Sequence, residues 1–208
     1  MTPGIQLSTV ISDGVFAAVT FACAVKLISK RNVTRTFGAA CMLFVGIAAA
    51  FGAARYGGAD VVVYHESLSW TARMIAIPVM GAVSCALAFG WRLPRYGWYG
   101  VGLVFGAAGW LLPHRFGVLP SAAGMALFLL GAARVSRVDR RSAIFVVVGV
   151  VLYLVAGLVV GNHGAYGPVQ RVDVFHVMLT IAHPLFTSAM IAADRRTPST
   201  GRTGQRLG

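Results

Sequence analysis

The sequence predicts an all-α fold: a polytopic membrane protein built as a seven-transmembrane-helix bundle. Of its 208 residues, 57% are hydrophobic and 12% are charged, whereas ordinary soluble domains have roughly 45–50% and about 25%. The apolar runs are also close to the ~20 residues that cross a hydrocarbon core, rather than the ~10–14 of a buried helix in a soluble protein. Lipid is therefore the expected solvent for most of this chain.

Three of the seven predicted spans lie in the first half of the chain. The first, 8–29, is expected to remain in the mature protein, because residues 1–10 carry no charge and Asp13 interrupts the apolar run. A cleavable signal peptide would instead begin with a positive segment and an unbroken apolar core. The second and third spans are 36–55 and 66–91. Basic residues precede the second span and follow the third, and they predict where the second span begins and the third ends.

Four further spans follow in the second half of the chain. They are predicted at 97–112, 118–134, 142–161 and 172–193, and only the first two are shorter than all the spans before them. Pro113 and Arg115 separate the first two of these and predict a tight turn rather than one long helix, and the charged segment 134–141 is an equally clear connection. All seven spans form one predicted transmembrane domain, 1–196. The Gly-, Thr-, Ser- and Arg-rich segment 197–208 is expected to be a disordered cytoplasmic tail.

Lysine and arginine are distributed unequally between the two sides of this arrangement. Fourteen of them lie on the side of the C-terminus and four elsewhere, so the positive-inside rule predicts a cytoplasmic C-terminus and an outside N-terminus. We expect a multi-pass protein of the cell inner (plasma) membrane whose partners are the lipid bilayer and the anionic lipids at its cytoplasmic face. The oligomeric state is left open.

The sequence favours neither nucleic-acid binding nor a role for the cysteines in disulfides or metal binding. The net charge of +12 comes from short basic clusters between apolar runs, a pattern that fits membrane topology better than nucleic-acid binding. Cys23, Cys41 and Cys85 lie inside apolar runs without CxxC spacing, so neither a disulfide framework nor a thiolate metal site is indicated.

Two predicted spans carry polar side chains at helical spacing. On the last span the residues recur every three or four positions and form one stripe: Asp173, His176, Thr180, His183 and Thr187. Glu66, Ser69 and Arg73 share a face of the third span, with His65 beside them. A charge at mid-span costs roughly 2.5–3.5 kcal/mol, so we expect a carboxylate partner for Arg73. The candidates are Asp13, Glu66 and Asp173.

Several chemistries are compatible with this polar cluster. In a hydrolase, His65, Asp173, His176 and His183 would bind a metal ion such as zinc, and Glu66 would act as a base toward a lipid-like substrate. In an electron-transfer protein, His65 and His176 would be the axial ligands of a haem. In a transporter or sensor, Asp13, Glu66, Arg73 and Asp173 would form a charge relay. In a purely structural cluster, the same side chains would only satisfy one another. Whether the protein is an enzyme stays open.

Two groups of residues carry a family resemblance. They are His65, Glu66 and Ser69 in the third span, and Asp173, His176 and His183 in the last. In architecture and at these positions the chain resembles the seven-span zinc hydrolases that include alkaline ceramidases and adiponectin receptors. The resemblance implies a metal-dependent hydrolase of lipid-like substrates, with Glu66 and Ser69 in the catalytic centre. The last span departs from the family, because Thr180 stands where its second histidine is expected.

Overall fold

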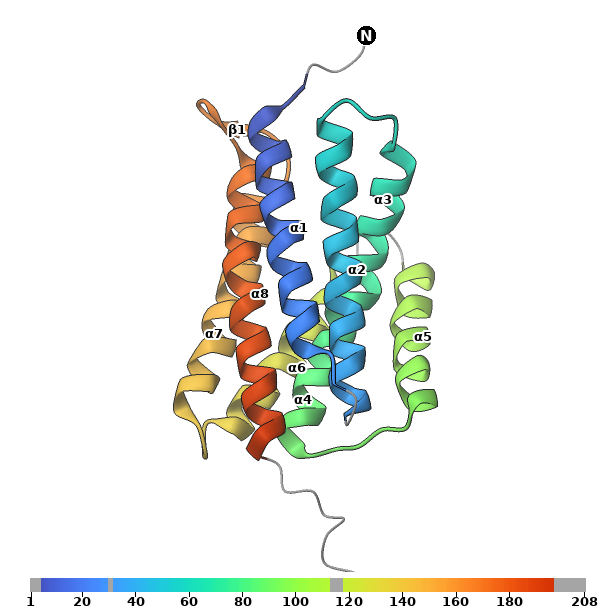
Figure 1. Ribbon diagram of the computed structural model, residues 1–208, viewed down its shortest axis with the longest axis vertical. Helices are drawn as coiled ribbons and strands as arrows, with labels where there is room; N and C mark the ends of the chain where they lie inside the picture. The colour runs from blue at the N-terminus through green and yellow to red at the C-terminus, as the bar shows by residue number, and fades with distance from the viewer. Residues whose placement is uncertain (1–4, 30–31, 113–117, 197–208) are drawn as a thin grey trace, which may run out of the picture.

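The computed structural model describes residues 5–29, 32–112 and 118–196, and within them it confirms the all-α prediction. The helices form one upright bundle (Figure 1). Their bounds are α1 Leu7–Leu27, α2 Val33–Tyr56, α3 Val62–Thr71, η1 Ala72–Ala76, α4 Ile77–Phe89, α5 Arg95–Leu111, α6 Leu119–Val135, α7 Arg140–Leu154, η3 Val155–Val160 and α8 Arg171–Arg196. A short antiparallel hairpin of β1 (Ala165–Tyr166) and β2 (Val169–Gln170) precedes α8.

Five of these helical segments are long and apolar enough to cross a membrane. They are α1, α2, the continuous α3–η1–α4 segment, the α7–η3 segment and α8. The chain is therefore a multi-pass membrane protein by length and composition. Helices α5 and α6 begin and end close to their predicted positions, but each has only 17 residues, or roughly 25 Å at 1.5 Å per residue. This is shorter than a typical hydrocarbon core of about 30 Å.

The helix ends follow from local sequence. Asn32 caps α2 by accepting a hydrogen bond from the Arg35 backbone N–H at 3.3 Å, and Asp139 caps α7 through the Ser142 N–H at 3.2 Å. Helix α4 ends at Gly90, whose φ of +73° is left-handed and favours glycine. Residues 113–117, where a turn was predicted, lie outside the described part of the chain.

Helix α1 lies between α2 and α8 along most of its length (Figure 1), and this arrangement positions the candidate site. Small residues allow such close packing in lipid. A Cβ atom at Gly46 of α2 would come 2.5 Å from the ring of Phe21 on α1, and one at Gly81 of α4 would come 2.1 Å from the Gly124 carbonyl oxygen of α6. In the third helical segment, the upper half, α3, packs against α2, while the lower half, α4, packs against α6, α2 and α8.

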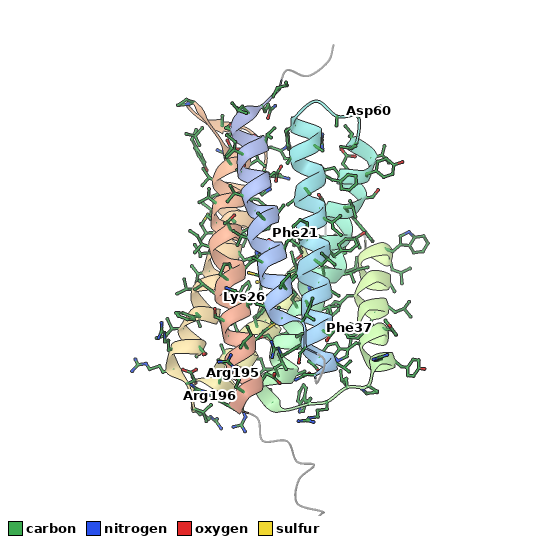
Figure 2. All side chains as sticks on the ribbon, viewed as in Figure 1. Phe21, Lys26, Phe37, Asp60, Arg195 and Arg196 are labelled. Atoms are coloured by element: carbon green, nitrogen blue, oxygen red, sulfur yellow. The ribbon has the colours of Figure 1, made fainter. Side chains whose placement is uncertain are left out.

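One end of the bundle collects most of the described basic side chains. We call it the basic end and define it by Lys26, Arg35, Arg92, Arg95, Arg134, Arg137, Arg140, Arg141, Arg195 and Arg196. In Figure 2, Lys26, Arg195 and Arg196 lie in the lower part of the view, whereas Asp60 lies at the other end. Asp194 and Asp139 anchor this end through ion pairs with Arg35 at 3.1 Å and Arg196 at 2.9 Å. The predicted tail, 197–208, is outside the described residues.

Candidate functional site

The candidate site is centred on Asp13, a carboxylate buried between α1 and α8. The Asp13 side chain is 1% exposed, and its Oδ1 atom lies 2.9 Å from Nδ1 of His176, which is 13% exposed. The angle between the two groups is not that of a hydrogen bond, and both oxygens of Asp13 lack an aligned donor within the described part of the chain. The contact is therefore chiefly electrostatic, and it is strongest when the imidazole is protonated.

Helix α2 contributes to this site through Gly52, which has no side chain. At Gly52, a Cβ atom would lie 2.6 Å from Oδ2 of Asp13 and 3.1 Å from Cε1 of His65. The absence of a side chain at Gly52 thus lets the carboxylate and the His65 ring approach the α2 backbone together. The Nδ1 atom of His65 is 3.3 Å from the Ala48 carbonyl oxygen one turn away on α2, so His65 is anchored to α2 by an Nδ1–H donor.

Asp173 continues the site toward the end of the bundle opposite the basic end. The Ser12 hydroxyl lies 3.1 Å from Oδ1 of Asp173 and 3.2 Å from the Thr9 carbonyl oxygen. A hydroxyl has one proton, so Ser12 donates to one of these acceptors at a time. Asp173 is half-buried, and it lies one turn from His176 on α8. A carboxylate that is partly open to the surroundings therefore sits one helical turn above the buried Asp13–His176 pair.

His183 is separated from this group by the ring of Phe16. That ring stacks on His176 with centroids 5.7 Å apart and meets the edge of His183 at 5.0 Å. His183 is fully buried; its Nδ1 lies 2.8 Å from the Leu179 carbonyl and its Nε2 lies 3.5 Å from the Tyr153 hydroxyl. These contacts fit a neutral ring that donates from Nδ1 and accepts at Nε2. His183 is a hydrogen-bonded core residue in this arrangement.

The predicted ligands His65, Asp173, His176 and His183 therefore do not converge on one ion. Among the described residues, no group of three His, Cys, Asp or Glu side chains could hold a metal. The physical reason is the spacing of α8: His176 and His183 are seven residues apart, or roughly 10 Å along the axis, and Phe16 fills the space between them. The Asp13 carboxylate contacts His176, and it borders Gly52 together with His65; haem ligation by His65 and His176 stays a prediction.

The structure corrects the prediction that Arg73 has a carboxylate partner. Arg73 is exposed, and within the described ranges it makes no ion pair. Asp13 contacts His176, Asp173 contacts Ser12 and Glu66 pairs with Arg55 at 3.6 Å. Glu66, on the same predicted face of the third segment, is also exposed, so this face points away from the buried Asp13 group. A π turn, η1 Ala72–Ala76, follows at this level, and in it the Ile77 N–H bonds to the carbonyl of Ala72 five residues earlier.

Two further predicted residues lie outside the buried group. Glu66 has a side chain that is 64% exposed and contacts only Arg55 among the ion pairs of the described residues. Ser69 is half-buried on α3, and its predicted catalytic role has no contact with the Asp13 group to support it. The structure thus brings together Asp13, His65 and His176, with Asp173 nearby.

Sequence reasoning missed two residues that shape the site. Gly52 lies in a run of alanines and glycines, where nothing marks the one glycine that faces a carboxylate. Phe16 is one apolar residue among many on α1, although its position three residues after Asp13 places it on the same helix face. The three-residue spacing from Asp13 was the only sequence signal for Phe16. It could be interpreted only once the helix that packs against this face of α1 was known.

The fold and the site together define a multi-pass α-helical membrane protein with an ionisable pair buried between its first and last helices. The chain belongs to a family of unknown function, DUF6962, whose match covers residues 8–195. No curated protein and no solved structure matches the chain significantly. The match includes every residue of the site from Asp13 to His183, so the site lies wholly within the family's own region.

Proposed function

We propose that this protein is a proton-responsive membrane transporter or sensor, in which the protonation of Asp13 and His176 alters how α1 packs against α8. The observation that carries this proposal is the position of Asp13. Its side chain is 1% exposed inside an apolar helix, and it meets an imidazole rather than an arginine or a lysine. Ionisable groups inside membrane helices are costly and commonly belong to proton or ion pathways.

The charge of the pair depends on how many protons it holds. A carboxylate beside a neutral imidazole has a net charge of −1, a carboxylate beside an imidazolium is neutral overall, and a protonated pair has a charge of +1. Attraction between α1 and α8 is greatest in the middle state, because opposite charges face each other across 2.9 Å. Gain or loss of a proton therefore weakens one specific helix contact.

The groups around the pair come from every helix packed against it. Helix α8 supplies Asp173, α3 supplies His65, and α2 supplies Arg55 and Tyr56 at its end. Arg55 is already paired with Glu66. The imidazole of His176 is thus the closest charged or chargeable partner of Asp13, and its protonation state has the largest effect on the pair.

A line of polar side chains extends from this pair toward the basic end along the α1–α8 contact. Its buried members below Phe16 are Thr20, Cys23, His183 and Thr187. Lys26, Cys23 and Thr187 line a hollow of about 140 Å³ at the lower part of this contact, beside Pro184. Pro184 has no N–H to donate to the Thr180 carbonyl, which loosens α8 at that level.

The ring of Phe16 interrupts this line between His176 and His183. A transporter would need the ring to move when the α1–α8 contact weakens, whereas a sensor would need only the change in packing. Pro184, one residue below His183, supplies a place where α8 can bend. The polar line, its apolar interruption and the loosened helix together support a proton-dependent rearrangement of these two helices.

The membrane arrangement is part of the same proposal. Seven crossings, with α5 and α6 as short spans, are accommodated by local bilayer thinning. The concentration of arginine and lysine at the basic end supports a cytoplasmic location for that end in a plasma membrane. The Asp13 site would then lie toward the outer leaflet, where Asp173 gives it access to the external medium.

Proton movement into liposomes tests this function. The purified protein is reconstituted with an internal pH-sensitive dye, a potassium gradient is applied with valinomycin, and wild type is compared with Asp13→Asn. The control is Glu66→Gln, which removes an exposed carboxylate from the same end of the bundle. Acidification by wild type and Glu66→Gln but not by Asp13→Asn supports a transporter.

A spin-label distance between α1 and α8, measured across the same pH range, tests the sensor alternative. A distance that changes with pH in wild type and is constant in Asp13→Asn supports a sensor even without proton movement. If neither proton movement nor the helix distance depends on Asp13, the proposed function is wrong.

A further inference from the structure

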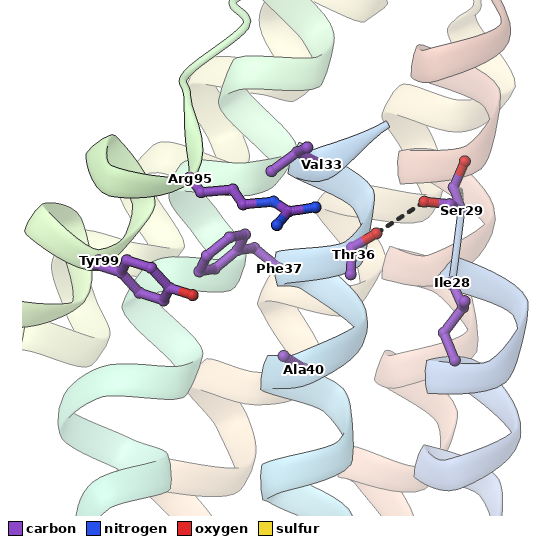
Figure 3. Close-up of a pocket in the computed structure, with 8 residues that line it drawn as sticks. All are labelled: Ile28, Ser29, Val33, Thr36, Phe37, Ala40, Arg95 and Tyr99. Carbon is purple, nitrogen blue, oxygen red and sulfur yellow. Dashed lines mark hydrogen bonds between the residues drawn. The ribbon is translucent and has the colours of Figure 1, made fainter. Parts of the chain in front are cut away.

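A second hollow lies at the basic end of the bundle, far from Asp13. It has a volume of about 520 Å³ and is bounded by the end of α1, the first turns of α2 and the start of α5 (Figure 3). Its apolar walls include Ile28, Val33, Phe37 and Ala40, and its polar side chains include Arg95 and Tyr99. It is large enough for part of a lipid chain, and its rim lies at the level where the helices end.

Aromatic contacts hold the walls of this hollow in place. The ring of Phe37 on α2 meets the edge of Tyr99 with centroids 5.3 Å apart and stacks on Trp98 at 5.9 Å. Trp98 is 1% exposed and is the one buried residue of α5. Helix α5 therefore packs against α2 mainly through these rings. The hollow lies where the two helices diverge.

Among the described residues that line the hollow, Arg95 is the one cation. Figure 3 shows its guanidinium group reaching from α5 toward α2, above the ring of Phe37 and beside Val33. Within the described residues, no carboxylate lies within ion-pair distance of this guanidinium: Asp194, the acid at this part of the basic end, is occupied by Arg35 at 3.1 Å and by the Asn32 amide. Arg95 is thus an exposed arginine that has no carboxylate partner among the described residues and that borders a hollow with apolar walls.

This combination matches the two parts of a phospholipid. A guanidinium binds phosphate through paired hydrogen bonds, and an apolar cavity below it accepts an acyl chain. Tyrosine at the rim is typical of the membrane interface. The basic end carries many uncompensated cations, which attract a lipid with net negative charge and repel the ammonium group of a zwitterionic one.

We propose that this hollow, which we call the α2–α5 groove, binds one anionic phospholipid, with the phosphate on Arg95 and an acyl chain against Phe37 and Ala40. This assigns a defined site to one lipid, in addition to the general attraction of basic residues to a negative membrane surface. It does not depend on the proton-linked function, because Asp13 and the α2–α5 groove lie at opposite ends of the bundle.

Native mass spectrometry of the detergent-purified protein tests this site. The protein is titrated with phosphatidylglycerol or with phosphatidylcholine of the same chains. We expect one phosphatidylglycerol to be retained under activation that removes phosphatidylcholine. We expect Arg95→Gln to weaken that binding at least fivefold. The matched control is Arg92→Gln, an exposed arginine three residues away that does not line the groove, and it should bind as wild type does.

Two further arms distinguish a bound phospholipid from a bound free anion and from a loss of folding. Ala40→Leu narrows the apolar part of the groove without changing its charge, and it should also weaken phosphatidylglycerol binding. Unchanged thermal melting of each variant verifies that the bundle is intact. Displacement of the lipid by millimolar inorganic phosphate would assign the site to a free anion and overturn the proposal. Equal weakening by Arg95→Gln and Arg92→Gln, or equal retention of the two lipids, would also overturn it.

Discussion

The backbone of Gly52 lies against the carboxylate of Asp13, so close that a Cβ atom at Gly52 would sit 2.6 Å from Oδ2. Helices α1 and α2 therefore meet at a point where one supplies a buried acid and the other supplies the space for it. Because the same Cβ atom would lie 3.1 Å from Cε1 of His65, this contact also determines how near the imidazole comes to the acid.

Alanine at Gly52 should disturb the site directly. The added methyl group overlaps the carboxylate and the His65 ring, so we expect Gly52→Ala to lower the free energy of unfolding by about 1–3 kcal/mol. The control is Gly14→Ala on α1, where a Cβ atom meets nothing within 4 Å; there the helix should gain up to about 1 kcal/mol. Thermal melting in detergent measures both, and equal effects would argue against the close approach.

The Asp13–His176 contact should show strong coupling in a double-mutant cycle. Removing one member of a buried pair leaves the other unpaired, so Asp13→Asn and His176→Gln should each destabilise the protein by about 3–5 kcal/mol. The double variant should cost less than the sum of the two single variants, because neither unpaired group remains. Unfolding in mixed detergent micelles measures the coupling. Additive losses would show that the two side chains do not interact.

Arg73 and Arg35 should differ in their contribution to stability. Arg35 pairs with Asp194 at 3.1 Å and donates to the Lys26 carbonyl at 2.9 Å, so Arg35→Ala should cost about 1–3 kcal/mol. Arg73 is exposed and makes no ion pair in the described ranges, so Arg73→Ala should change the unfolding free energy by less than about 0.5 kcal/mol. Thermal melting of the two variants checks this order. The reverse order would restore a buried partner for Arg73.

Asp139 at the basic end should make stability depend on pH in the acid range. The Ser142 hydroxyl at 2.5 Å, together with the Ser142 N–H and Arg196, holds the pKa of Asp139 below its ordinary 3.8. A lowered pKa means that the stabilisation is complete above pH ~5 and is lost as pH falls through the folded-state value. The stability difference between wild type and Asp139→Ala should therefore shrink below pH ~4. A difference that grows on acidification would contradict this assignment.

The positions of the helices could be predicted from the sequence, because apolar runs mark the helices and basic connections mark their ends on the side of the C-terminus. The third segment is an example: 66–91 was predicted, and the described helix runs from Val62 to Phe89. The polar stripe on α8 was also visible, and the structure turns its His176 toward α1. Both features depend on local periodicity, which can be seen in a single sequence.

The partners of the polar side chains could not be predicted in the same way. Which helix lies beside α8 depends on packing among all the helices, so Asp13 was only one of three candidate partners for Arg73, and its contact with His176 was not singled out. The π turn at Ala72–Ala76 has no proline or glycine within it to mark the position. Close approaches such as that at Gly52 depend on the distance between two helices, which residue spacing does not contain.

Infrared difference spectroscopy of the reconstituted protein tests the central claim most directly. The spectrum is recorded on stepping between about pH 5 and pH 8, the range over which imidazoles titrate, for wild type, Asp13→Asn and Glu66→Gln. Wild type and Glu66→Gln should share a carboxyl band that is absent from Asp13→Asn. If the difference spectra of wild type and Asp13→Asn are the same, Asp13 takes no part in proton binding over this range.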